Sequence, residues 1–185
     1  MLAACAGGTP PPTTLATLPA SQARPDLSGT WVLDPEAAEK PMARLADLTE
    51  ALRRADPLAQ PAAPGAVPTA SGTLPEEFGP YLRPARTLQI DHADPLLRIR
   101  SLGQVRELYT DLRAAAVTAG GAAGQRVAVA GWENAAVVVE TAFDGDARVV
   151  QRYHLRDGAL HVDQLFDLPR LERPLVVTLT YRRER

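Results

Sequence analysis

The sequence has a single cysteine, Cys5, and a single lysine, Lys40, among its 185 residues. One cysteine cannot form a disulfide bond within the chain, so an internal disulfide framework is excluded. Long apolar runs are missing as well: no stretch approaches the roughly 18 consecutive apolar residues that a membrane-spanning helix needs. The chain that remains is 45% hydrophobic. It is long enough to bury one good core, and we expect a single domain.

Excess charge and catalytic motifs are also absent. The formal net charge is −2 and the basic residues are scattered along the chain, which argues against the basic footprint of a nucleic-acid-binding protein. The sequence contains no G-x-S-x-G, H-E-x-x-H, C-x-x-C, P-loop or G-x-G-x-x-G pattern. We therefore expect neither an enzyme nor a bound cofactor.

Cys5 ends the sequence LAAC, which resembles the lipobox of bacterial lipoproteins, where an aliphatic residue and two small residues precede the lipid-bearing cysteine. Residues 6–25 have the Pro, Thr, Ala and Gly content of a flexible tether. We interpret residues 1–26 as a lipobox remnant and tether that anchors the protein in the bacterial envelope, on the periplasmic side of the outer membrane. A lipoprotein signal needs charged and apolar regions before the lipobox, so we expect the natural start to lie upstream. The alternative is a chance cysteine in a disordered tail.

Order is predicted to begin with a strand over residues 27–33, where polar and apolar residues alternate around Trp31. Asp34 at an N-cap, with a proline directly after it, predicts a helical insertion over about residues 35–56. Residues 57–84 are rich in Pro and Ala and have no period. They predict a long loop.

From residue 85 onward, short alternating runs are separated by turn residues, which is typical of an antiparallel meander. Asp157-Gly158 is a favoured two-residue hairpin turn, so the numbers of facing residues sum to about 315. The apolar face then pairs Leu155 with Leu160, Tyr153 with Val162, Gln151 with Gln164, and Val149 with Phe166. The opposite face pairs His154 with His161, and Arg152 with Asp163 as an ion pair.

Two further hairpins are predicted in the same way. A turn at Gly103-Gln104 pairs Ile99 with Leu108 inside and Arg100 with Glu107 outside; a turn at Ala93-Asp94 pairs Ile90 with Leu97 and Leu88 with Ile99. Two later runs add Val137, Val139, Thr141 and Phe143, and then Leu175, Val177, Leu179 and Tyr181, to the apolar face. The count reaches about eight to ten strands, enough to close an up-and-down barrel.

The G-T-W sequence on the first predicted strand resembles the G-x-W motif of the lipocalin (calycin) superfamily. In that family the tryptophan packs at the closed end of the barrel against an arginine from the barrel's last part. The matching residues here are Gly29, Trp31 and either Arg182 or Arg183. The stretch LSGTWVLDPE followed by a meander also resembles uncharacterised bacterial envelope proteins, often lipoproteins. Over residues 27–185 the resemblance implies an all-β, lipocalin-like barrel, here with a helix after the first strand, and it implies no reaction.

Polar residues on the apolar face point to a ligand. Buried amides need hydrogen-bond partners, and in a barrel wide enough for one small molecule such groups orient that molecule. The candidate ligand-binding residues are Gln151, Gln164, Tyr153, Thr141, Val139 and Tyr181. The alternative is a filled barrel in which the two glutamines bond one another.

His154, His161 and Asp163 are the weak candidate for a metal site, because the predicted register points all three side chains the same way. They lie on the face opposite the apolar one, where solvated residues need no function. Arg152 is predicted to form an ion pair with Asp163. We therefore expect no metal ion.

The sequence as a whole predicts a lipid-anchored, lipocalin-like protein that binds or carries a small, largely apolar ligand inside its barrel, with residues 57–84 and the preceding helix as a lid. The alternative is a structural or assembly lipoprotein of the envelope, with a packed barrel that acts through a protein partner. A cavity lined by the candidate residues favours binding, and a filled core favours the alternative.

Overall fold

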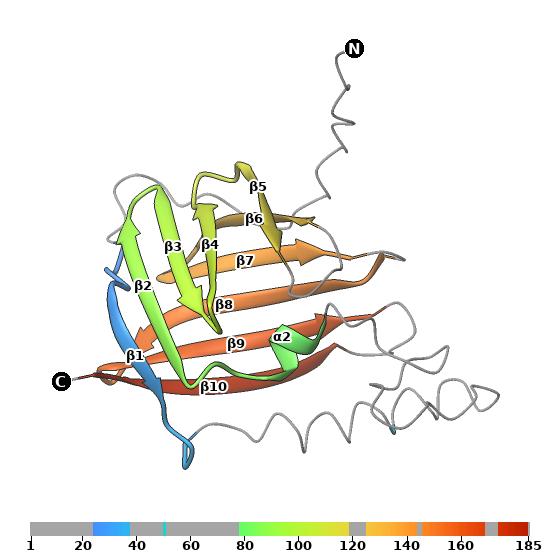
Figure 1. Ribbon diagram of the computed structural model, residues 1–185. Helices are drawn as coiled ribbons and strands as arrows, with labels where there is room; N and C mark the ends of the chain where they lie inside the picture. The colour runs from blue at the N-terminus through green and yellow to red at the C-terminus, as the bar shows by residue number, and fades with distance from the viewer. Residues whose placement is uncertain are drawn as a thin grey trace.

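The computed structural model describes residues 24–37, 50, 78–118, 125–143, 146–168 and 174–184. In these ranges, ten strands form one antiparallel sheet that curls into a nearly closed barrel (Figure 1). The all-β, up-and-down barrel that the sequence predicts is confirmed, and its strand number lies within the expected eight to ten.

In chain order the strands are β1 (Gly29–Leu33), β2 (Thr87–Ala93), β3 (Leu96–Ser101), β4 (Gln104–Tyr109), β5 (Ala114–Thr118), β6 (Gln125–Glu133), β7 (Ala136–Ala142), β8 (Arg148–Arg156), β9 (Ala159–Asp167) and β10 (Leu175–Arg183), and the short helix α2 (Gly79–Leu82) lies between β1 and β2. Consecutive strands pair with one another except β4 and β5, and β1 also pairs with β10, so the sheet order is β4-β3-β2-β1-β10-β9-β8-β7-β6-β5. β4 and β5 are the two edge strands.

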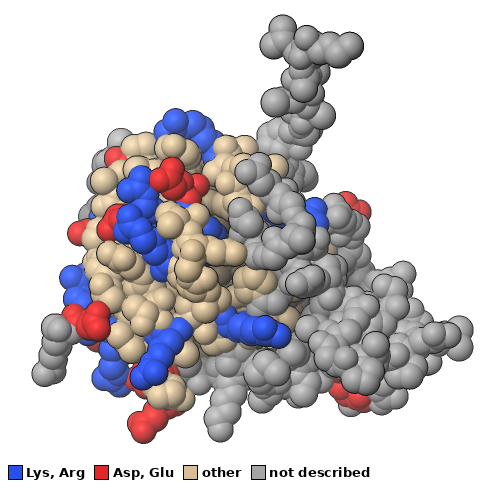
Figure 2. Space-filling view, in the orientation of Figure 1, with Lys and Arg blue, Asp and Glu red and all other residues tan. Residues whose placement is uncertain are grey.

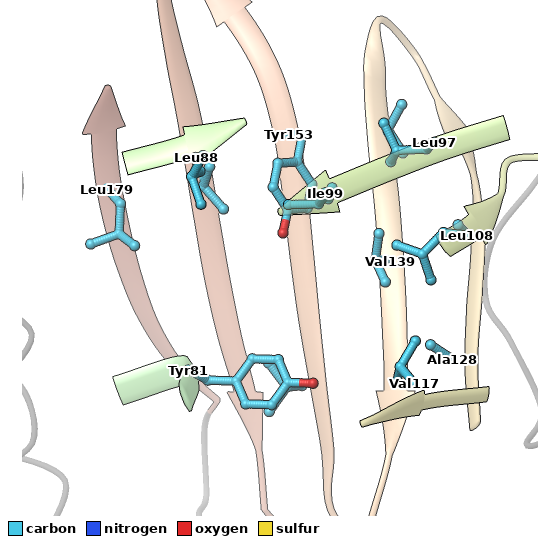
Figure 3. Close-up of a cluster of buried hydrophobic side chains, with 14 of the residues drawn as sticks. Tyr81, Leu88, Leu97, Ile99, Leu108, Val117, Ala128, Val139, Tyr153 and Leu179 are labelled. Atoms are coloured by element: carbon cyan, nitrogen blue, oxygen red, sulfur yellow. The ribbon is translucent and has the colours of Figure 1, made fainter. Parts of the chain in front are cut away.

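The core fills much of the space that the curled sheet encloses. Leu97 and Ile99 from β3 point toward Val139 from β7 and Tyr153 from β8, on the facing side of the barrel (Figure 3). All four side chains are at most 1% exposed. The alternation of apolar and polar residues along each strand places this set inside, as a half-buried sheet requires.

The outer face carries paired surface charges. Arg98 donates to Glu107 at 2.8 Å, and Arg100 donates to Asp91 at 2.6 Å. Charged side chains of both signs lie next to one another over β2 and β3, and the centre of this face is mostly uncharged (Figure 2). Exposed pairs of this kind contribute little to stability.

The β8–β9 hairpin has the register that the sequence predicts. Its turn residues Asp157 and Gly158 have positive φ values of 54° and 75°, as a type I′ turn requires, and Gln151 faces Gln164. One predicted contact is wrong. Arg152 stands opposite Asp163 in the register, but its guanidinium pairs with Glu133.

The registers predicted for the two earlier hairpins are both wrong by two positions. The β3–β4 turn lies at Leu102-Gly103, whose φ values are 50° and 74°, so Ile99 faces Arg106. The β2–β3 turn lies at Asp94-Pro95, and Ile90 faces Ile99. Proline cannot donate a ladder hydrogen bond, which favours its place in the turn. A shift of two keeps each side chain on its predicted face.

The region after β1 departs in part from its prediction. The Oδ1 atom of Asp34 accepts the backbone N–H groups of Glu36 and Ala37 at 3.1 and 3.3 Å, in the manner of an N-cap. Within the predicted loop over residues 57–84, the segment Gly79–Leu82 is helical instead. Burial of Tyr81 and Leu82 against the barrel stabilises a turn that the local sequence alone does not favour.

Several predictions fall on parts of the chain outside the described residues. These are the lipobox with Cys5, most of the tether, most of the helical insertion over residues 35–56, and residues 57–77 of the loop. In the described part, no helix is long and apolar enough to cross a membrane.

Candidate ligand-binding site

A cavity of about 90 Å³ lies inside the barrel next to α2 and the β3–β4 turn. Helix α2 lies at the same end of the barrel as the β3–β4 turn (Figure 1), and both contribute residues to the cavity lining. Its lining residues are Pro80, Tyr81, Pro84, Ala85, Leu88, Ser101, Leu102, Gln104, Arg106, Gln151, Tyr153, Val162, Gln164, Leu179 and Tyr181. We call the end of the barrel that contains this cavity and the β3–β4 turn the cavity end.

Arg106 supplies the positive charge in the cavity wall. It lies on β4 with the same inward direction as Leu108, two residues on, because side chains alternate along a strand. Its Nη1 donates to Oε1 of Gln151, and its Nη2 donates to the hydroxyl of Tyr153, each at 2.8 Å. The guanidinium is thus held by two neutral acceptors from β8.

Among the described residues Arg106 has no carboxylate partner, and its guanidinium donates to an amide and a phenol. Burial opposes its charge, but the neighbouring hydroxyls of Tyr153 and Tyr81 raise the pKa of Arg106 above its ordinary value. The guanidinium is therefore charged at every physiological pH. A partly buried cation without a counter-charge is costly, and it offers an anion a ready partner.

Gln164 faces Gln151 from β9 and is 5% exposed. Its Oε1 atom is buried and accepts no hydrogen bond. The alternative in which the two glutamines satisfy each other does not hold for Gln164 Oε1, because that atom has no partner and Gln151 Oε1 accepts from Arg106. The cavity wall thus contains a charged donor and an unpaired acceptor.

Two tyrosines complete the polar lining. Burial raises the pKa of Tyr153, despite the Arg106 guanidinium beside it, and burial followed by the influence of Tyr153 raises the pKa of Tyr181. Both phenols therefore stay protonated and available as hydrogen-bond donors.

The other two candidate residues are buried but do not line this cavity. Val139 belongs to the core. Thr141 accepts a hydrogen bond of 3.4 Å from the hydroxyl of Tyr81, which reaches into the barrel from α2 (Figure 3). The structure thus brings together four of the six candidates, namely Gln151, Tyr153, Gln164 and Tyr181.

The residues of the G-x-W resemblance meet where β1, β2 and β10 pair. The guanidinium of Arg183 lies 4.8 Å from the centre of the Trp31 ring and donates to the carbonyl of Ser28 at 2.9 Å. Arg182 instead donates to Asp34 at 2.6 Å. Gly29 has a φ of 141°, a backbone conformation that favours glycine, and a Cβ atom there would lie 3.4 Å from the Arg183 guanidinium, in van der Waals contact.

The β2–β3 turn marks the opposite, closed end of these strands. The carboxylate of Asp94 accepts hydrogen bonds from Trp132 Nε1 at 3.1 Å, from the Thr110 hydroxyl and from Arg24. His92 lies against Trp132, with ring centres 5.5 Å apart. Arg24 and Asp94 form an ion pair, so each of these two charges has a counter-charge.

The weak metal candidates form hydrogen bonds among neighbours. His154 Nε2 lies 3.0 Å from Asp163 Oδ2, and the rings of His154 and His161 stack with centres 5.4 Å apart. Asp163 also accepts from Thr178 at 2.8 Å. Across the described ranges, no group of three or more His, Cys, Asp or Glu side chains is placed to hold a metal ion.

The sequence analysis missed Arg106. The signal was present, because the alternation that places Leu108 inside also places Arg106 inside. The predicted register set Ile99 opposite Leu108, and the observed register sets it opposite Arg106.

Comparison with known proteins establishes the fold. No protein-family model and no curated protein matches the sequence. A secretory abundant heat soluble protein from Ramazzottius varieornatus has a TM-score of 0.53 at 8% identity, over 85% of this chain and 95% of that one. Secretory abundant heat soluble protein 4 from the same organism has a TM-score of 0.52 at 10% identity, over 89% and 100%. The REP1-NXSQ fatty acid transporter has a TM-score of 0.49 at 14% identity, over 86% and 96%. At identities this low, the two heat soluble proteins, whose TM-scores exceed 0.5, show a common fold alone.

Proposed function

We propose that this protein binds a small amphipathic acid, with the acidic group at Arg106 and the apolar part toward the mouth of the cavity. This refines the largely apolar ligand that the sequence predicts. The observation that carries the proposal is a guanidinium in the wall of a cavity inside the barrel, bonded to the neutral oxygens of Gln151 and Tyr153 and without a carboxylate partner among the described residues. A carboxylate that enters the cavity gains a charge-assisted hydrogen bond with a donor already in place.

The size of the cavity limits the part of the ligand that it holds. About 90 Å³ is well below the roughly 300–1,000 Å³ of sites for drug-sized molecules. The head group and its first carbons fit inside. The rest of an alkyl chain lies at the mouth, where the side chain of Leu102, which lines the cavity, is 60% exposed. This exposed apolar side chain is suited to contact such a chain.

The proposal includes the anchoring and the absence of catalysis that the sequence predicts. The protein is a carrier or binding protein, not an enzyme, and it is held through lipidated Cys5 at the periplasmic side of the bacterial outer membrane. The support for this location is the LAAC sequence and the tether composition of residues 6–25.

Calorimetry with octanoic acid and 1-octanol tests the binding proposal on the full 185-residue chain. Octanoate is expected to bind at least tenfold more tightly than the alcohol, because only the acid pairs with Arg106. Arg106→Gln removes the charge and is expected to remove this preference. Arg98→Gln is the matched control, since Arg98 lies on the outer face in an exposed ion pair. Equal affinities for acid and alcohol, or loss of binding in both variants, would overturn the proposal.

Membrane fractionation tests the anchoring. In a bacterial host that exports the protein through a complete lipoprotein signal, the protein is expected in the membrane fraction, and Cys5→Ser is expected to release it. If both forms fractionate alike, the lipobox interpretation is wrong.

A further inference from the structure

We infer that the acid bound by this protein carries a hydroxyl group on one of its first carbons, and that Gln164 accepts the hydrogen bond from that hydroxyl. The inference rests on the proposed function and names the ligand class more closely. It starts from the unpaired Oε1 atom of Gln164, which is buried in the wall of the cavity.

No donor among the described residues forms a hydrogen bond with this acceptor. Gln164 has Gln151 opposite it on β8 and Val177 opposite it on β10. The side chain of Val177 is apolar, and the amide of Gln151 does not donate to Gln164 Oε1, which has no partner. One N–H of each Nη of Arg106 is directed at Gln151 or at Tyr153, and the guanidinium forms no hydrogen bond with Gln164 Oε1.

An unpaired buried acceptor is unfavourable, and an apolar side chain of the same shape avoids the loss. A leucine at this position would continue the run of apolar neighbours on the inner face of β9, which holds Leu160, Val162 and Phe166. The amide oxygen is therefore explained by a hydrogen-bond donor that belongs to the ligand.

The acidic group cannot be that partner. A carboxylate only accepts hydrogen bonds, and the adjacent guanidinium of Arg106 favours its ionised form. The donor must belong to another part of the same molecule. Because one cavity of about 90 Å³ contains both Arg106 and Gln164 in its lining, the donor and the acid lie within a few bonds of each other. A hydroxyl on one of the first carbons of the acid meets this requirement.

The test compares the affinities of octanoic, 2-hydroxyoctanoic and 3-hydroxyoctanoic acid for the full chain by calorimetry. At least one hydroxy acid is expected to bind about tenfold more tightly than octanoate, and Gln164→Leu is expected to abolish that difference while it leaves octanoate binding intact. Gln89→Leu is the matched control. Gln89 lies exposed on β2, so its replacement is expected to leave the preference unchanged.

Methoxy analogues test the same point without a change in the protein. A methoxy group keeps the acceptor oxygen and loses the donor, so 2-methoxy- and 3-methoxyoctanoic acid are expected to bind no better than octanoate. This measurement stands even if Gln164→Leu fails to fold.

Three other results overturn the inference in different ways. If octanoate binds through Arg106 and both hydroxy acids bind equally well, water satisfies Gln164 and only the hydroxyl inference fails. If Gln164→Leu keeps the preference, another residue recognises the hydroxyl. If none of the three acids binds, the proposed function fails, and this inference fails with it.

Discussion

At the closed end of the barrel, the carboxylate of Asp94 has Arg24 as its counter-charge and accepts further hydrogen bonds from Trp132 and Thr110. At the cavity end, the guanidinium of Arg106 meets only neutral oxygens. The same β2, β3 and β4 strands connect the two ends. The closed end is thus completed by the protein's own residues, and the cavity end leaves one charge and one acceptor for a ligand.

This contrast separates residues that stabilise the fold from residues that serve binding. Removing a paired group leaves its hydrogen-bond and charge partners unsatisfied, which lowers the free energy of unfolding. Removing a group that has no counter-charge costs little stability and affects binding. Substitutions at the closed end are therefore expected to lower stability, and substitutions at the cavity end are expected to weaken binding.

The largest effect on stability is expected for Asp94→Ala. The substitution leaves the indole N–H of Trp132 without its acceptor and leaves the Thr110 hydroxyl with its longer, 3.3 Å hydrogen bond to the Pro95 carbonyl, and these residues are 0% and 2% exposed. It also removes the counter-charge of Arg24. Together these losses predict a decrease of about 2–4 kcal/mol in the free energy of unfolding, measured by urea denaturation.

Asp91→Ala is the control for this prediction. Asp91 forms an exposed ion pair with Arg100, and such pairs are worth about 0–1 kcal/mol. Equal decreases in the free energy of unfolding for the two substitutions would show that the contacts of Asp94 contribute no more to stability than an exposed ion pair.

Arg106→Gln is expected to lie at the other extreme of the comparison. It removes a charge that has no carboxylate partner and keeps an amide that reaches toward the same neighbours. The free energy of unfolding of the ligand-free protein is therefore expected to stay within about 1 kcal/mol of the original. A loss above about 3 kcal/mol in urea denaturation would mean that Arg106 holds the barrel together.

The two ends also differ in how far the sequence predicts them. At the β8–β9 hairpin, the Asp157-Gly158 turn is the favoured type, so local chemistry sets the register and the facing positions of Gln151 and Gln164. At the β3–β4 hairpin, the turn uses Leu102 with a positive φ. That choice is unfavourable for leucine on local grounds, and sequence reasoning placed the turn one residue too late.

Long-range contacts account for the other errors. Arg152 has Asp163 as its register partner, yet a long side chain reaches residues on several strands, and it pairs with Glu133. The helical turn Gly79–Leu82 depends on the burial of Tyr81 and Leu82. The charged residue of the site was predictable by alternation, but its partners depend on the closure of the barrel, which brings β4 across from β8.

Arg183→Ala is expected to have a moderate effect at the G-x-W contact. The substitution removes the guanidinium that lies over Trp31 and donates to the Ser28 carbonyl. A partly exposed cation–π contact with one hydrogen bond predicts a loss of about 1–2 kcal/mol. Thermal and urea unfolding measure this loss, with Arg98→Ala as an exposed arginine control. An effect no larger than that of the control would show that the contact does not stabilise the barrel.

A small effect is also expected from the pH dependence of the closed end. Burial lowers the pKa of His92 below its ordinary 6.5, with Asp94 and Asp26 acting in the opposite direction and Arg24 in the same one. His92 Nδ1 accepts the backbone N–H of Leu27 at 3.4 Å, and its Nε2 is buried without a partner. The closed end therefore favours the neutral ring.

Because the folded pKa of His92 lies below the unfolded one, the unfolded chain binds more protons between the two values, and stability falls as the pH drops below about 6.5. The contribution is expected to be at most about 1.3 kcal/mol between pH 7 and 5.5, because one proton contributes at most about 1.4 kcal/mol per pH unit and the unfolded ring is only partly protonated above pH 6.5. Burial also lowers the pKa of His161, so the measurement is the difference between the original protein and His92→Gln in urea denaturation at each pH. The variant is expected to show the shallower decrease on acidification. Parallel pH profiles would mean that the ring titrates as freely in the folded barrel as in the unfolded chain, and that the closed end tolerates a third charge beside the pair formed by Arg24 and Asp94.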